Sequence, residues 1–207
     1  MKKLLFAASA LAALSLLTPS AGFAQFHDYD NTVGIFLDED ATQTEKLDGL
    51  ANVPFFVYIV LLRPATLDGS GYPDVNAFEL TINSSDNTIF KLAEGLPAGA
   101  INVGDATVVA NGLEYIVGLA NSISVDQQAV TLFSLQLMSL TGNPFELFVG
   151  PTSKPSIDGE MAFQSVSPIL IPMFSSAGAP GSAVFGFNTG VVAIESETWG
   201  GVKSLYR

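Results

Sequence analysis

Short apolar runs separated by turn residues recur along the chain, and their periodicity is that of strands. The segment from Val75 to Asn83 alternates most clearly, because Phe78, Leu80 and Ile82 share one face and polar or small residues share the other. The longest run, Val53 to Arg63, is rich in β-branched and aromatic residues but does not alternate cleanly. We therefore expect either a strand covered on both faces or a strand that carries a bulge.

The remaining runs are shorter, and a turn signal follows most of them. They are Val33–Leu37, Ile89–Leu92, Ala106–Ala110, Leu113–Leu119, Ala129–Leu140, Phe145–Val149, Met161–Val166, Ile169–Phe174 and Ala183–Phe187. Asn111-Gly112 predicts a tight hairpin, since both residues tolerate positive φ. Pro168 and Pro172 make Ile169–Phe174 an edge strand or an extended loop. About ten short strands without helical periodicity between them predict an all-β fold, an antiparallel sandwich or barrel.

The two ends of the chain differ from this pattern. Residues 1–24 begin with Lys2-Lys3, continue with the apolar run Leu4–Leu17 and end in Gly22-Phe23-Ala24, which is typical of a cleaved export signal. An apolar run of this length is too short for a membrane-spanning helix, which needs about 20 residues. We expect a mature chain with no membrane span, divided into a β-sandwich domain (residues 25–194) and a tail (residues 195–207).

The tail predicts a short helix, because its apolar residues recur at helical spacing behind Thr198, a suitable N-cap. Its candidate partner-binding or sorting residues are Trp199, Val202, Lys203, Leu205, Tyr206 and Arg207.

Composition excludes several classes of function. The chain has 8 basic and 20 acidic residues, so removing Lys2 and Lys3 leaves a net charge of −14. This acidity argues against nucleic acid and anionic membrane as partners. The chain has no cysteine, so it offers no catalytic thiol, no thiolate zinc site and no disulfide, and its one histidine, His27, is too few for a histidine zinc site. No nucleophile elbow or phosphate-binding glycine loop is present, and we expect no enzymatic activity.

Two groups of carboxylates remain as candidate sites. Calcium is the possible cofactor, with Asp38 and Asp40 after the first strand and Asp68 and Asp74 in a loop spaced like a calcium loop. Proline at position 73 stands where that loop needs glycine, so we interpret Asp68 to Asp74 as a turn and the Asp38 group as a solvated strand end, we expect no metal or cofactor, and calcium is the alternative. Among strand residues, Glu79, Glu114 and Glu146 are candidates for paired catalytic carboxylates, with a solvated sheet face as the simpler interpretation.

The order of segments resembles that of cohesin-type modules of secreted bacterial proteins. The similar stretches are VNAFELTI (residues 75–82) followed by IFKLAEG (89–95), and LFSLQLMSLTGNPFELFVG (132–150). The resemblance implies a jelly-roll β-sandwich of about nine to ten strands that binds a protein partner. The ending TWGGVKSLYR (198–207) is similar to a short terminal motif of other exported bacterial proteins.

We therefore expect an exported, non-enzymatic β-sandwich that binds a protein or assembles at the bacterial cell surface. The expected location is the periplasm, the cell surface or the extracellular space. One alternative is a carbohydrate-binding module with a polysaccharide ligand. Another is a self-associating subunit of a fibre or surface layer.

Overall fold

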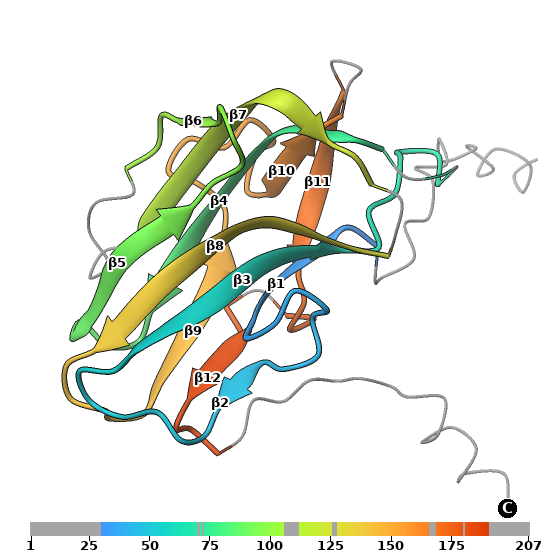
Figure 1. Ribbon diagram of the computed structural model, residues 1–207. Helices are drawn as coiled ribbons and strands as arrows, with labels where there is room; N and C mark the ends of the chain where they lie inside the picture. The colour runs from blue at the N-terminus through green and yellow to red at the C-terminus, as the bar shows by residue number, and fades with distance from the viewer. Residues whose placement is uncertain are drawn as a thin grey trace, which may run out of the picture.

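The computed structural model describes residues 30–69, 71, 73–105, 112–125, 128–165, 169–179 and 181–190, and their secondary structure is entirely β. Two sheets pack face to face (Figure 1). Sheet A contains, in spatial order, β1 (Thr32–Phe36), β3 (Pro54–Leu62), β8 (Ala129–Ser139) and β5 (Ile89–Gly95). No helix occurs among the described residues, so none there is long and apolar enough to cross a membrane.

Sheet B is built around β4 (Val75–Ser84). One edge of β4 pairs with β7 (Leu113–Ile123), which in turn pairs with β6 (Ile101–Asn102). The other edge pairs with β10 (Met161–Gln164) near its start and with β9 (Phe145–Gly150) near its end. Beyond β10 lies β11 (Leu170–Ser175), and beyond β9 lie β12 (Phe185–Phe187) and β2 (Glu45–Lys46).

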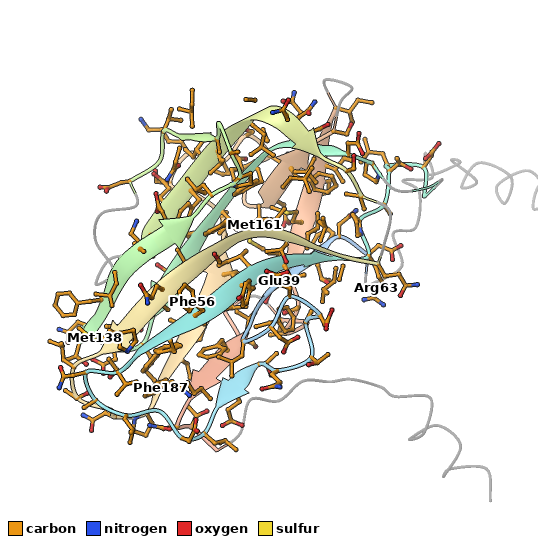
Figure 2. All side chains as sticks on the ribbon, in the orientation of Figure 1. Glu39, Phe56, Arg63, Met138, Met161 and Phe187 are labelled. Carbon is orange, nitrogen blue, oxygen red and sulfur yellow. The ribbon has the colours of Figure 1, made fainter. Side chains whose placement is uncertain are left out.

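The core lies between the sheets and confirms the alternation read from β4. Phe78, Leu80 and Ile82 are buried, and the Phe78 ring stacks on Phe133 of sheet A with ring centres 5.5 Å apart. At the other end of the sandwich three further aromatic rings meet, with Phe187 between Phe55 and Phe145. Figure 2 labels Phe187 at this end. Aromatic contacts of this kind add to the free energy of apolar burial and fix how the sheets sit on each other.

The longest apolar run, β3, carries no extra residue itself, although its pairing with β8 contains a bulge. The register between β3 and β8 shifts between Ile59 and Val60, because β8 carries an extra residue, Leu132, at that point. Ile59, Val60 and Leu61 are all buried, so both faces of β3 are covered there. The first interpretation of the missing alternation, a strand covered on both faces, is therefore confirmed, whereas the bulge belongs to the partner strand and not to β3.

The prediction of a purely antiparallel sandwich is wrong. β1 runs parallel to β11, and β2 runs parallel to β12. The segment read as an edge strand or loop, β11, is instead an inner strand that pairs with β10 of sheet B and with β1 of sheet A. Parallel pairs join segments that are far apart in sequence, so no local turn signal in the sequence predicts them. The part of the chain that the structure describes contains twelve strands, more than the nine to ten expected, since β2 and β6 have only two residues each.

Some predictions lie outside the described residues. They are the export signal, the strand Ala106–Ala110 with the turn residue Asn111, and the helical tail with Trp199, Val202, Lys203, Leu205, Tyr206 and Arg207.

Candidate binding groove on sheet B

The outer face of sheet B carries a groove of about 490 Å³ that crosses five strands. Its position follows from the strand register, which places one residue from each strand in a single row. From edge to edge the row is Ile101 (β6), Gly118 (β7), Ala77 (β4), Gln164 (β10) and Leu170 (β11). Five neighbouring strands span about 19 Å, given the usual spacing of about 4.8 Å.

The floor of the groove is made largely of small side chains, with the polar Gln164 beside them, and its rims are large and apolar. Gly118 and Ala77 lie at the centre of the row, with Ala162 in the next row. On the β6 side the rim consists of Ile101 and Val103, whose side chains are 67% and 73% exposed. These are the most exposed large apolar residues among those described, and both lie against the groove.

Gly118 is the most informative residue of the floor. A side chain added there would meet no atom within 4 Å, and its φ lies outside the left-handed region. Neither backbone conformation nor packing within the chain therefore requires glycine. A glycine inside a strand weakens the strand and commonly marks a place where another molecule approaches closely. Sequence reasoning missed the groove, although a glycine within the run Leu113–Leu119 is the signal that could have found it.

The loop of residues 151–159 closes one end of the groove, and two carboxylates of sheet B hold it. Glu79 is only 6% exposed and accepts hydrogen bonds from the backbone N–H and the hydroxyl of Ser156, at 2.6 and 2.9 Å. Glu114 accepts a hydrogen bond from the Ser153 N–H at 2.6 Å. This hydrogen bond holds the pKa of Glu114 below its usual value.

These contacts bear on the catalytic interpretation of the three strand carboxylates. Glu79 on β4 and Glu114 on β7 are diagonal neighbours in the sheet, so their Cα atoms are about 7–8 Å apart. Both are bonded to the loop rather than open to a substrate. Glu146 lies on β9 opposite Ser85, the residue that follows β4. Ser85 is six residues beyond Glu79, so Glu146 lies about 20 Å from Glu79 along the strand direction. The structure therefore gives Glu79 and Glu114 the role of loop anchors.

The four calcium candidates do not converge. Asp38 accepts hydrogen bonds from the N–H and hydroxyl of Thr42, and the nearby Asp40 is exposed. Asp68 accepts a bond from the Thr66 hydroxyl, and Asp74 accepts one from the Val125 N–H at 3.4 Å. Within the described part of the chain, no three acidic or histidine side chains are grouped to share an ion. Calcium binding stays an untested alternative from the sequence.

Comparison with known proteins gives only distant similarities. No protein-family model and no curated protein matches the chain. Among solved structures, the chain is similar to the cohesin module of a family 33 glycoside hydrolase from Clostridium perfringens, with 10% identity, a TM-score of 0.47 and coverage of 70% of this chain and 91% of that one. It is also similar to a type I cohesin–dockerin complex from Clostridium thermocellum, with 11% identity, a TM-score of 0.42 and coverage of 71% and 89%. At these values neither similarity assigns the chain to a family or gives it a partner, and the groove is interpreted from its own geometry.

Proposed function

We propose that the chain is an exported β-sandwich module that binds a protein partner in the groove on sheet B. The observation that supports this most directly is the row from Ile101 to Leu170, in which a floor of small residues lies between exposed apolar rims. Exposing apolar rims on both sides of a hollow is unfavourable in water unless a partner covers them. The groove would bind apolar side chains of the partner, and its floor would allow a close approach of the partner's backbone.

The uncharged, apolar lining favours a protein partner over a polar or charged ligand. The one carboxylate in the floor, Glu79, is already hydrogen-bonded by the 151–159 loop, so the groove offers no free charge to a polar substrate. The centre of a protein interface is typically depleted of charged side chains and rich in apolar ones. A hollow of about 490 Å³ lies in the size range of binding sites, and its five-strand width admits a helix or an extended segment.

Export rests on residues 1–24 and gives the module its proposed place in the periplasm, at the cell surface or outside the cell. Amino-terminal sequencing of the protein recovered from the envelope or medium of a bacterial host tests this part. Export predicts a mature amino terminus at Gln25, whereas a retained Met1 in a cytoplasmic fraction would contradict it.

The groove is tested with a phage-displayed library of random peptides selected on the immobilised mature protein. The enriched peptides are then synthesised, and their affinity is measured by calorimetry. Gly118→Trp fills the floor and should weaken binding at least tenfold, because the added ring occupies the space next to Ala77. Phe56→Ser on sheet A is the matched control and should leave the affinity unchanged. The proposal fails if the selected peptides bind the Gly118→Trp variant as well as the wild type.

A further inference from the structure

The outer face of sheet A is covered at one end and bare at the other. Val60 and Phe36 point outward on β3 and β1, yet they are 0% and 4% exposed, so the chain itself covers them. In contrast, Phe56 on β3 and Phe90 on β5 are 52% and 48% exposed on the same face. Figure 2 shows Phe56 and Met138 toward the end of sheet A that lies away from Arg63.

The bare end forms a largely apolar surface, in which the uncharged Gln136 is the register partner of Phe56, and we name this surface the sheet A patch. Its members are Phe56, Phe90, Leu92, Met138 and Leu140. Met138 lies at its centre, because it is the register partner of Phe90 on one side and of Pro54 on the other. Leu92 is the extra residue at the irregularity in β5. Methionine and phenylalanine are both enriched in protein interfaces, so the composition is that of an interface centre.

The sheet A patch carries no charge, although the chain has a net charge of −12. The charged side chains of β5, Lys91 and Glu94, point to the inner side of the strand and pair with each other at 2.7 Å. Two identical acidic molecules repel each other over most of their surface, and a face without carboxylates is where this repulsion is weakest. The patch exposes on the order of 400 Å² of apolar side chain, about half of the roughly 800 Å² that each partner contributes to a standard interface.

We propose that the sheet A patch is the interface for a second copy of this chain. A two-fold axis along β8 makes the surface complementary to itself, because it places β3 of one copy over β5 of the other. Phe56 of each copy then lies against Phe90 of its mate, and Met138 lies near the axis. A closed dimer of this kind uses one patch twice, as isologous interfaces do. The edge of β5 is a poorer route to association, because Lys91 and the irregularity at Leu92 disfavour strand pairing there.

Cross-linking tests the proposal directly, since the chain has no cysteine of its own. In the mature protein, Met138→Cys places a thiol near the proposed axis, and Val103→Cys places one on the opposite face at a more exposed position. Random collision favours the more exposed thiol. The proposed dimer predicts the reverse, with disulfide-linked dimer forming at least tenfold faster for Met138→Cys under mild oxidation. Equal rates, or faster linkage through position 103, would overturn the proposal.

Sedimentation of the unmodified protein gives a second test that involves no thiol. The wild type should shift from monomer to dimer as its concentration rises from about 1 µM to 500 µM, the range expected for an interface of modest apolar area. Phe56→Asp should remain monomeric throughout, because two carboxylates would then face the patch. Val103→Asp is the control and should dimerise like the wild type. A wild type that is monomeric at 500 µM, or a dimer that persists in Phe56→Asp, counts against the proposal.

Discussion

At the scale of single residues, Gly104 and Gly118 differ in whether the fold requires glycine at that position. A side chain at Gly104 would collide with the carbonyl group of Glu114, so the chain's own packing excludes it. A side chain at Gly118 would meet nothing. The first glycine is therefore required by the fold, and the second is retained at a cost in strand stability. Such a cost at a surface position is typical of residues kept for function.

Substitution at these two positions should change stability in opposite directions. Gly118→Val is expected to raise the free energy of unfolding by about 0.5–1 kcal/mol, because valine favours the strand and has room. Gly104→Ala is expected to lower it by about 1–3 kcal/mol through the collision with the Glu114 backbone. Urea denaturation monitored by circular dichroism measures both. A destabilised Gly118→Val variant would mean that the floor of the groove is already filled in solution.

The limits of sequence reasoning are also clearest at this scale. Alternation placed Phe78, Leu80 and Ile82 in the core correctly, because a period of two needs only local information. The same alternation put Glu79 on the solvated face, where it is in fact buried beneath Ser156. Likewise, the row that forms the groove joins β6, β7, β4, β10 and β11, whose register is set by long-range pairing. A single sequence contains no direct record of that register.

At the scale of elements, the loop of residues 151–159 acts as one wall of the groove because sheet B holds it in place. Its two described anchors, Glu79 and Glu114, come from neighbouring strands and accept bonds from Ser156 and Ser153. The Thr81 hydroxyl of β4 also donates a hydrogen bond to the Pro151 carbonyl at 3.2 Å, so four hydrogen bonds join the loop to sheet B. Loss of either carboxylate should loosen the loop before it unfolds the sandwich.

Glu79→Ala tests this dependence. The variant leaves the Ser156 N–H and hydroxyl without their acceptor, so we expect a loss of about 1.5–3 kcal/mol in unfolding free energy. Hydrogen exchange at the Ser156 amide should accelerate at least tenfold, while exchange in the core strand β8 follows only the global change. Glu79→Gln retains an acceptor and should show a smaller effect. Unchanged exchange at Ser156 in the alanine variant would show that other contacts hold the loop.

At the scale of the whole molecule, a polar contact joins the two sheets along their β5–β7 side. The Tyr115 hydroxyl, on β7 of sheet B, donates a hydrogen bond to Glu94 on β5 of sheet A at 3.2 Å. Lys91 pairs with the same Glu94 oxygen and lies 5.9 Å from the centre of the Tyr115 ring. Burial, and next the negative charge of Glu94, raise the pKa of Tyr115 well above its usual value.

This raised pKa predicts how stability depends on pH. The unfolded chain releases the Tyr115 proton near pH 10, whereas the folded chain retains it, so stability falls as pH rises above 10 by up to about 1.4 kcal/mol per pH unit. Tyr115→Phe should be about 1 kcal/mol less stable at pH 7 through the lost hydrogen bond. It should then lose less stability than the wild type between pH 10 and 11.5. Urea titrations at both pH values measure this, and identical pH dependence in the two proteins would contradict it.

The two proposed binding surfaces lie on opposite faces of one sandwich, the groove on sheet B and the apolar patch on sheet A. Two copies joined through sheet A would therefore hold their grooves about four sheet layers apart, facing in opposite directions, at a distance set by rigid packing of about 10 Å per layer. Such a dimer could not bind two neighbouring sites on one flat target. It bridges two separate targets instead, so a partner with repeated binding sites would be gathered into a network whose strength rises with valency.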